Sequence, residues 1–360
     1  MPSSIEEVLK VKIREDGSID LAEFIDSALY HPEFGYYMTR DPFGVDGDFI
    51  TAPEVSQMFG EMLGVWLADI WMQMGKPETL DVLECGPGRG TLMADIVRAT
   101  SNITGFHGAL HIKMLECSPT LKNKQAQALS LFENVEWIDN LDAVEGAAPI
   151  IILGNEFLDA FPVQHYRSKN NKTQKCVVIL EDGEFVKDWH DAERECPAGS
   201  IQEVSPAQED FVDECLELLE GVSGACLFID YGYFNVKSGE TLQILNKHKK
   251  VGLFDAIGES DITAHVNFGA LKGQVQSAGA RWHGGVTQSD FLKILGIELR
   301  AKALKNSALS DLSIRGAQQK MTDIDRDLKR LVDVKEMGEL FKAVCFSNGL
   351  NINPAGFQNE

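Results

Sequence analysis

From Lys76 onward the chain alternates short apolar segments with longer amphipathic ones, and this alternation constrains the fold more than any other feature of the 360-residue sequence. The apolar segments of strand length are residues 79–86, 110–118, 134–139, 148–157, 224–232 and 339–348. Strands that are separated by helices usually pair in parallel, because each helix carries the chain back across a face of the sheet. The sequence therefore predicts a doubly wound α/β fold over residues 76–360.

The stretches outside this alternation have different patterns. Residues 1–75 have mostly helical spacing, interrupted by a loop-like stretch rich in Gly, Pro and aromatic residues. Residues 166–200 contain a β-hairpin pattern that turns at Asp182–Gly183, and residues 233–285 are Gly-rich and mixed. We therefore expect a helical N-terminal extension and lid over residues 1–75, followed by one domain with insertions at about 166–200 and 233–285.

The charge of the chain argues against a nucleic-acid partner. The formal net charge is −22, and there is no Lys/Arg block beyond short stretches such as Lys247–Lys250, whereas phosphate backbones are bound mainly by clustered bases. No apolar run reaches the roughly 18–20 residues that a membrane span needs. The first residues lack an apolar signal core and mix acids with bases. We expect a bacterial cytoplasmic protein or, if a presequence is missing, a mitochondrial matrix protein.

The cysteines and histidines do not form a metal-binding pattern. The seven cysteines are odd in number and never form CxxC, and the eight histidines are scattered with no HExxH motif. This arrangement is typical of reduced thiols in a core, and we expect neither a disulfide framework nor a metal site.

A glycine-rich loop, VLECGPGRGTL, joins the first predicted strand to a helix. Gly86, Gly88 and Gly90 allow the backbone to turn sharply and to approach a ligand closely, and the helix start presents free N–H groups. The P-loop pattern is absent, and Thr91 replaces the last Gly or Ala of the dinucleotide fingerprint. Glu84 would be unhelpful beside a pyrophosphate but suits a cationic ligand. The loop therefore favours S-adenosylmethionine, which has a sulfonium, an ammonium and no phosphate.

Acidic residues follow the next two predicted strands. Glu116 lies 26 residues after Gly90, where a carboxylate can accept hydrogen bonds from both ribose hydroxyls. Asp139 follows the third strand and is placed to accept from an adenine amino group. Acids at strand ends can also serve only to solvate those ends. Together with the glycine loop, however, they favour a nucleoside-type methyl donor.

The fourth predicted strand runs into GNEFLDAFPV, which places Asn155 and Glu156 beside the expected position of the transferable methyl group. Glu156 and Asp159 would share one face if a helical turn began there. Such an acid pair could hold a guanidinium, localise its lone pair and accept its proton during an in-line transfer. The alternative is that both acids cap the following helix.

Several short segments also occur in the order found in a known family. They are ALYHPEFGYYM, GDFITAPEVSQMFGEMLG, LECGPGRGTLMADI, NEFLDAFPVQ, IDYG, DITAHVNF, TQSDFLKILGI and MGELFKAV. From about Leu29 to Val344 the chain thus resembles the MidA-like family, which comprises a mitochondrial complex I assembly factor described as a protein-arginine methyltransferase and many bacterial members. The resemblance implies a class I methyltransferase (Rossmann-like) fold and symmetric dimethylation of an arginine in a complex I subunit. It places the donor motif, the ribose acid and the catalytic loop on Gly86, Gly88 and Gly90, on Glu116, and on Asn155–Glu156.

The segment GDFITAPEVSQ precedes a long apolar helix. We expect Thr51, Pro53 and Gln57 to close over the donor and exclude water, the alternative being a packed Gly/Pro turn that introduces the helix. An exposed apolar patch along the helix from Trp66 to Trp71 would make a homodimer surface, but we favour packing of this helix against the sheet.

These observations lead to one functional hypothesis and its alternatives. We expect an S-adenosylmethionine-dependent methyltransferase whose partner is a protein with a target arginine. The alternatives are transfer to a small molecule or to another residue type, and an assembly factor that binds the donor without catalysis.

Overall fold

The computed structural model describes residues 2–39, 51–194, 196, 200–235, 239–311 and 313–357. The chain divides into two compact units, each made of separate stretches of sequence. Unit 1 comprises Met1–Phe49, Leu158–Val212 and Asn235–Asn267, and unit 2 comprises Ile50–Phe157, Asp213–Phe234 and Phe268–Glu360. The predicted division into an extension, a main domain and two insertions stays a prediction.

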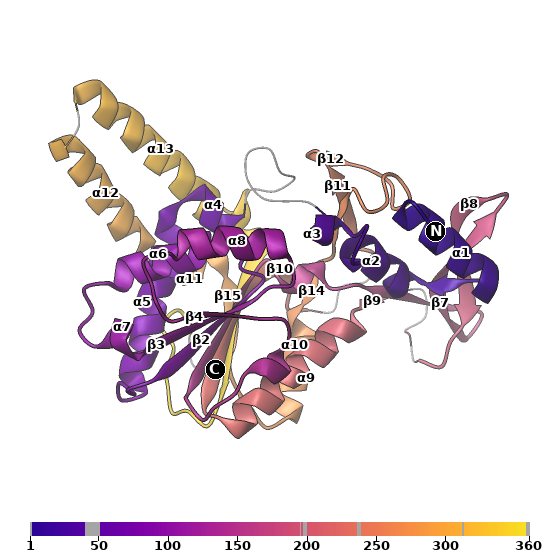
Figure 1. Ribbon diagram of the computed structural model, residues 1–360, viewed down its shortest axis with the longest axis horizontal. Helices are drawn as coiled ribbons and strands as arrows, with labels where there is room; N and C mark the ends of the chain where they lie inside the picture. The colour runs from indigo at the N-terminus through magenta and orange to yellow at the C-terminus, as the bar shows by residue number, and fades with distance from the viewer. Residues whose placement is uncertain are drawn as a thin grey trace. The chain divides into compact units, whose positions relative to one another are not determined.

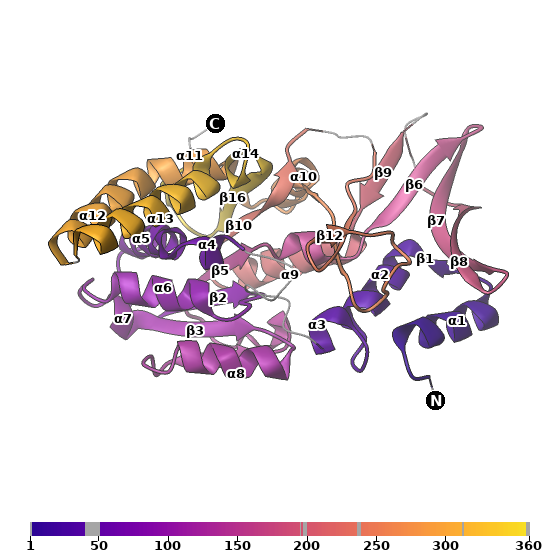
Figure 2. The same ribbon diagram turned by 90° about the horizontal axis from the view of Figure 1, so that it is seen from above.

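Unit 2 is built on a mixed sheet with the strand order β15-β16-β10-β5-β2-β3-β4 and with helices on both of its faces (Figures 1 and 2). The strands are β2 (Leu80–Cys85), β3 (Leu110–Leu115), β4 (Val135–Ile138), β5 (Ile150–Asn155), β10 (Gly224–Tyr233), β15 (Arg281–Thr287) and β16 (Phe341–Asn348). Neighbouring strands from β10 to β4 are parallel, whereas β16 is antiparallel to both β10 and β15. The predicted doubly wound α/β class is confirmed.

The helices of this part of the chain lie before and between the strands, singly or in succession. They are α4 (Ala52–Val55), α5 (Gln57–Gln73), α6 (Thr91–Thr100), α7 (Phe106–Ala109), α8 (Pro119–Ala128), α9 (Pro206–Gly221), α10 (Phe268–Ser277), α11 (Gln288–Ile294), α12 (Ile297–Asp311), α13 (Ile314–Val332) and α14 (Met337–Leu340). A short 3₁₀ helix, η1 (Leu141–Ala143), follows β4. The crossover helices α6 and α8 lie directly after the carboxyl ends of β2 and β3, so they position the loops at this edge of the sheet.

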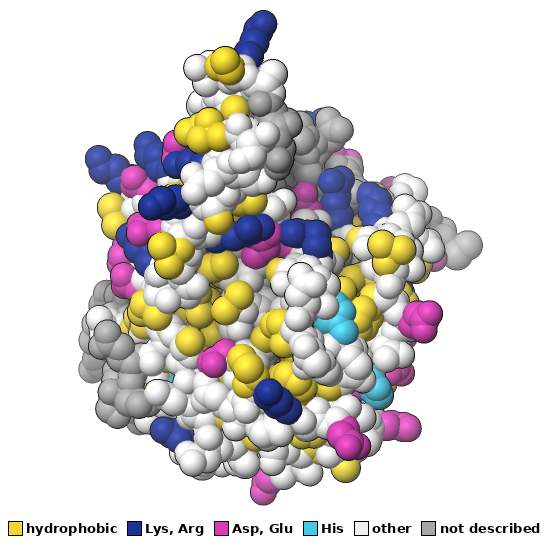
Figure 3. All heavy atoms as spheres, turned by 90° about the vertical axis from the view of Figure 1, so that its left-hand side faces the viewer, with side chains coloured by type: hydrophobic (Ala, Val, Ile, Leu, Met, Phe, Trp, Pro, Cys, Tyr) yellow, Lys and Arg dark blue, Asp and Glu magenta, His cyan; other side chains and the backbone are white. Residues whose placement is uncertain are grey.

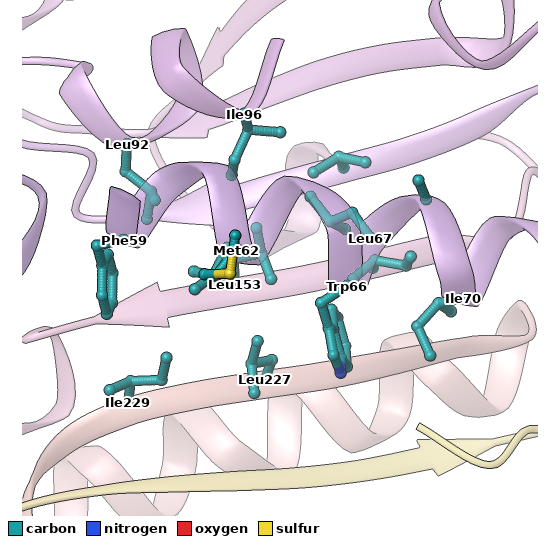
Figure 4. Close-up of a cluster of buried hydrophobic side chains, with 14 of the residues drawn as sticks. Phe59, Met62, Trp66, Leu67, Ile70, Leu92, Ile96, Leu153, Leu227 and Ile229 are labelled. Carbon is teal, nitrogen blue, oxygen red and sulfur yellow. The ribbon is translucent and has the colours of Figure 1, made fainter. Parts of the chain in front are cut away.

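Helix α5 packs against the sheet and supplies much of the core (Figure 4). Its side chains face Leu153 of β5 and Leu227 of β10, and Trp66 and Trp71 are only 0% and 3% exposed. Burial of such large apolar side chains stabilises the fold by about 1.5–3 kcal/mol each. The packing of this helix against the sheet is therefore confirmed, and the two tryptophans are not available as a homodimer surface.

Helices α12 and α13 form an antiparallel pair (Figures 1 and 2). Its base is held by Glu61 of α5, which is buried and forms a bidentate ion pair with Arg300 of α12 at 2.7 and 2.8 Å. Arg98 of α6 also binds Glu61, at 3.0 Å. Figure 3, which looks onto the left-hand side of Figure 1, shows hydrophobic side chains lying among charged side chains of both signs.

Unit 1 combines short helices with two small antiparallel sheets. Its elements are α1 (Ile5–Asp16), β1 (Ile19–Asp20), α2 (Leu21–Tyr30), α3 (Tyr36–Thr39), η2 (Leu158–Ala160), β6 (Gln164–Lys169), β7 (Lys172–Glu181), β8 (Glu184–Asp191), β9 (Ile201–Val204), β11 (Gln243–Asn246), β12 (Lys249–Lys250), β13 (Asp261–Thr263) and β14 (Val266–Asn267). One sheet has the order β1-β7-β6-β9 with β8 paired to β7, and the other has the order β12-β11-β13. The predicted hairpin turn at Asp182–Gly183 is confirmed, since both residues have positive φ between β7 and β8.

The described part of the chain offers neither a membrane-spanning helix nor a cluster of metal ligands. None of its helices combines the length and the apolar character that crossing a bilayer requires. Within residues 2–39, 51–194 and the later described ranges, no group of three or more His, Cys, Asp or Glu side chains could hold a metal ion.

Candidate functional site

The glycine loop lies between β2 and α6 and is held tightly by its neighbours. The φ angles are +62° at Gly86, +54° at Gly88 and +80° at Gly90, in the left-handed region that side chains with a Cβ rarely adopt. A Cβ added to Gly86 would lie 2.7 Å from the ring of Phe157, and one added to Gly90 would lie 3.1 Å from Cα of Gln125. The loop is therefore fixed both by its backbone conformation and by close packing.

Glu84 lies one residue before the end of β2 and is 3% exposed. Its Oε2 atom has no hydrogen-bond partner among the described residues. Burial raises the pKa of this carboxyl from 4.5 to about 8. A buried acid without a partner is costly unless another group satisfies it, and the cationic part of a ligand at the adjacent loop would do so.

Glu116 directly follows β3 and is also buried. Its Oε1 accepts a hydrogen bond from the Ser118 N–H at 2.8 Å, and its Oε2 accepts one from the Gln125 amide at 3.0 Å. Burial raises the pKa of Glu116, and these two hydrogen bonds partly oppose that rise. Gly86 donates its N–H to the carbonyl of Leu115, so the end of β3 and the glycine loop are adjacent. The ribose role of Glu116 stays a prediction.

Asp139 directly follows β4, the third strand in this series. Its side chain is exposed, and its Oδ1 binds Nζ of Lys122 at 2.6 Å. The strand ends thus bring Glu84, Glu116 and Asp139 to one edge of the sheet in the order that parallel pairing requires. The adenine role of Asp139 stays a prediction.

Glu156 follows β5 and has an unusual backbone conformation, with φ at +51°. Its Oε1 accepts hydrogen bonds from the Ala52 N–H at 3.0 Å and from the Asn155 amide at 3.2 Å. Its own N–H donates to the carbonyl of Ile229 at 2.9 Å. The Oδ1 atom of Asn155 is buried without a hydrogen-bond partner among the described residues. Left-handed backbone at a residue with a side chain is strained, and such strain tends to occur at functional sites.

Asp159 is buried in η2, which begins at Leu158 and belongs to unit 1. Glu156 lies before this 3₁₀ turn and has left-handed backbone, so no helical turn contains both acids. The condition under which the two acids would share one helical face is therefore not met. The catalytic role of Asp159 stays a prediction.

The predicted lid residues lie around helix α4. Thr51 is its N-cap residue but makes no side-chain capping bond, and Pro53 is buried in its first turn. Gln57 donates to Glu61 at 3.1 Å and so joins the ion-pair cluster of α5. Closure over a donor by Thr51, Pro53 and Gln57 stays a prediction.

Other residues of the same segment make contacts with the site that the sequence analysis missed. Ala52 donates its backbone N–H to Glu156, and Glu54 accepts a hydrogen bond at 2.6 Å from the hydroxyl of Thr91, the first residue of α6. Asp230 in β10 was also missed; its Oδ2 accepts the N–H of Phe157 at 3.0 Å and so supports the turn that contains Glu156. These residues lie in the segments TAPE, GRGT and IDYG, which already stood out in the sequence. A local pattern, however, does not show which residues of different segments form hydrogen bonds with one another.

Comparisons with known proteins show which family the chain belongs to. The family model described as "Putative S-adenosyl-L-methionine-dependent methyltransferase" matches residues 62–286. A relative from Danio rerio, named protein arginine methyltransferase NDUFAF7, mitochondrial, is 32% identical over 94% of this chain and 86% of its own length. The Homo sapiens protein of the same name is 31% identical, over 92% of this chain and 81% of its own.

A solved structure is similar over nearly the whole chain. It is a protein from Burkholderia thailandensis bound to S-adenosyl-homocysteine, with 27% identity and a TM-score of 0.83 over 98% of this chain and 94% of that one. A native structure of a protein from the same organism gives a TM-score of 0.82. The family model covers more than half of the chain, and the relatives align with most of it. The chain therefore belongs to this family of S-adenosyl-L-methionine-dependent methyltransferases.

Proposed function

We propose that this protein transfers a methyl group from S-adenosylmethionine to an arginine side chain of a protein, with Glu156 as the catalytic acid–base group. One observation carries the proposal. Glu156 is held in strained left-handed backbone beside the glycine loop, and Ala52 and Asn155 both donate hydrogen bonds to the same carboxylate oxygen. A carboxylate fixed in this way is suited to orienting a cation rather than to solvating a loop.

The residues at the sheet edge fit the methyl donor. We propose that the orphaned carboxyl of Glu84 binds its cationic amino-acid part, that Glu116 accepts hydrogen bonds from its ribose, and that Asp139 accepts from its adenine. The loop of Gly86, Gly88 and Gly90 would let the main chain approach closely. When bound, S-adenosylmethionine supplies an electrophilic methyl group on a sulfonium.

The residues after β5 fit the acceptor. We propose that Glu156, with Asn155, holds the guanidinium so that one nitrogen keeps its lone pair directed at the methyl group. Glu156 would take up the proton that this nitrogen loses. Alignment and fixed charges would supply most of the rate acceleration in such a displacement. Support for arginine comes from the names of the curated relatives.

The acceptor protein and its location are also proposals. Following the family resemblance, we propose a subunit of respiratory complex I as the substrate. We place the enzyme in the bacterial cytoplasm, with the mitochondrial matrix as the alternative that the names of the curated relatives favour. The net charge of −22 is the reason for preferring a protein over a nucleic acid.

The test is transfer of labelled methyl groups from S-adenosylmethionine into an extract of cells that lack this protein, followed by hydrolysis and identification of the methylated amino acid. We expect labelled methylarginine with the wild type. Glu156→Gln keeps the shape of the side chain and should still bind S-adenosylhomocysteine within about threefold, yet lose at least about 100-fold in transfer. Glu133→Gln, at an exposed position in the same unit, is the matched control and should behave as the wild type.

Three other results would contradict parts of the proposal. Label in a small molecule or in another residue type would overturn the arginine assignment. Donor binding without transfer to any acceptor would favour an assembly factor. Unchanged transfer by Glu156→Gln would remove Glu156 from the chemistry while leaving donor binding untouched.

A further inference from the structure

Gln125 lies on helix α8 and is completely buried, although its side chain is polar. Its amide nitrogen donates to the carbonyl of Gly88 at 2.8 Å and to Oε2 of Glu116 at 3.0 Å. Its amide oxygen accepts a hydrogen bond from Nε1 of Trp137 at 2.8 Å. An indole nitrogen can only donate, whereas a carbonyl and a carboxylate accept, so these partners fix the orientation of the amide.

These contacts connect three neighbouring strand ends through one side chain. Gly88 lies in the loop after β2, Glu116 follows β3, and Trp137 belongs to β4. The main chain of Gln125 also lies against Gly90, where an added Cβ would be 3.1 Å from Cα of Gln125. Buried, fully satisfied polar networks hold their members in one arrangement. The amide of Gln125 therefore fixes the position of the glycine loop relative to the carboxylate of Glu116.

The same hydrogen bond affects the charge of Glu116. Burial raises the pKa of this carboxyl, and the Ser118 N–H and the Gln125 amide lower it. The backbone N–H of Cys117 and the charge of Lys122 on α8 also lower this pKa. Lys122 is itself paired with Asp139, and the thiol of Cys117 lies beside Glu116. Removal of the amide N–H would therefore raise the pKa of Glu116 further. Ribose hydroxyls need an ionised carboxylate that can accept from both of them.

We propose that Gln125 is a positioning residue of the methyl-donor site, which keeps Glu116 oriented and ionised and fixes the glycine loop beside it. This inference rests on the donor site proposed above. Gln125 would act on the donor site through its hydrogen bonds to Glu116 and Gly88, without having to touch the donor itself.

Calorimetric titration of S-adenosylhomocysteine into the full chain near pH 6 and pH 8 tests the role. Gln125→Met keeps the length of the side chain but removes its hydrogen bonds, and we expect an affinity loss of about tenfold near pH 6, because hydrogen bonds to charged groups are the stronger ones. The loss should shrink as the pH rises, because a larger share of Glu116 is then ionised in the variant. Gln127→Met, at an exposed position on the same helix, is the matched control and should bind as the wild type.

Gln125→Glu provides an independent readout with the opposite sign. While protonated, the introduced carboxyl can still donate one hydrogen bond, but once ionised it repels Glu116, so the affinity loss should grow as the pH rises. In a Glu116→Gln background, Gln125→Met should cost no more than about threefold, because the two residues act as a unit.

The possible results separate this inference from the proposed function. If the wild type does not bind S-adenosylhomocysteine, the proposed donor site is wrong, and the role of Gln125 with it. If the wild type binds and Gln125→Met binds equally well, only the role of Gln125 is overturned. An equal loss at both pH values would overturn its effect on the ionisation of Glu116 and support only its hold on the glycine loop. If Gln125→Met does not fold, the pH dependence of Gln125→Glu decides.

Discussion

Glu84 offers a sharp prediction, because an unpaired buried acid should make the protein less stable as the pH rises. We expect Glu84→Gln to raise the free energy of unfolding above about pH 7, since glutamine keeps the shape of the side chain but cannot ionise. The pKa of Glu84 rises from its ordinary 4.5 to about 8 in the folded protein. At about 1.4 kcal/mol per pKa unit this rise corresponds to roughly 5 kcal/mol, and we expect a measured gain of about 3–5 kcal/mol near pH 8.

The sign and the pH window follow from the same pKa values. Below the unfolded pKa of 4.5 the acid is protonated in both states, so the wild type and Glu84→Gln should be about equally stable. Between 4.5 and about 8 the unfolded chain releases the proton while the folded protein keeps it, so the wild type loses stability as the pH rises. Above about pH 8 the difference should level off, since both states are then ionised.

Urea unfolding of both proteins near pH 5, 6.5 and 8 measures this difference, and titrations shared by the two proteins cancel. An equal gain at all three pH values would refute the reasoning, because it would show that ionisation of Glu84 does not contribute. Destabilisation of Glu84→Gln near pH 8 would refute it as well. A ligand that brings a cation to Glu84 should lower its pKa again, so binding of S-adenosylhomocysteine near pH 7 should release a proton, detectable as a dependence of the binding heat on the buffer.

Two further predictions concern a glycine and a buried acid elsewhere. Gly90→Ala should reduce stability by about 1–2 kcal/mol and weaken S-adenosylhomocysteine binding, because position 90 has φ at +80° and a Cβ there would lie 3.1 Å from Cα of Gln125. Thermal unfolding measures the stability and calorimetry the binding, and an unchanged melting temperature would contradict this prediction. In unit 1, burial raises the pKa of Glu203, but hydrogen bonds from His165 and Thr241 outweigh it and lower the pKa overall. The wild type should therefore lose more stability than Glu203→Gln as the pH falls from about 5 to 3, because the stability that a lowered pKa provides is lost when the carboxyl is protonated. Acid unfolding curves that run parallel for the two proteins would contradict this role of Glu203.

The central part of the fold could be predicted because its signals are local. Strands β2, β3, β5 and β10 are short apolar runs, and the loop after β2 has a glycine at every second position from 86 to 90. Parallel pairing then places Glu84 and Glu116 at one edge of the sheet without further information. The location of these two acids thus follows from the order of the strands, whereas the hydrogen bonds of Glu116 depend on residues that only the folded chain brings to it.

Elements that tertiary contacts determine could not be predicted. Strand β15 has a bulge between Trp282 and Gly284, and Gly285 is needed where a Cβ would collide with the ring of Phe234. Both features break the alternation of apolar and polar side chains that marks a strand in the sequence. Helix α12 exposes Leu299 at 75%, which blurs its apolar face. Gln125 looks like a surface residue until the chain brings it to Gly88, which is 37 positions away.

The place of β16 in the sheet has a consequence for how a newly made chain matures. This strand, Phe341–Asn348, lies between β10 and β15, although it is synthesised after both of them. Until it arrives, the edge of β10 that it will cover has unpaired N–H and C=O groups, and such edges recruit other chains. Pairing of distant segments is also slow. Translation that stops short of Phe341 should therefore release a product that is prone to aggregation.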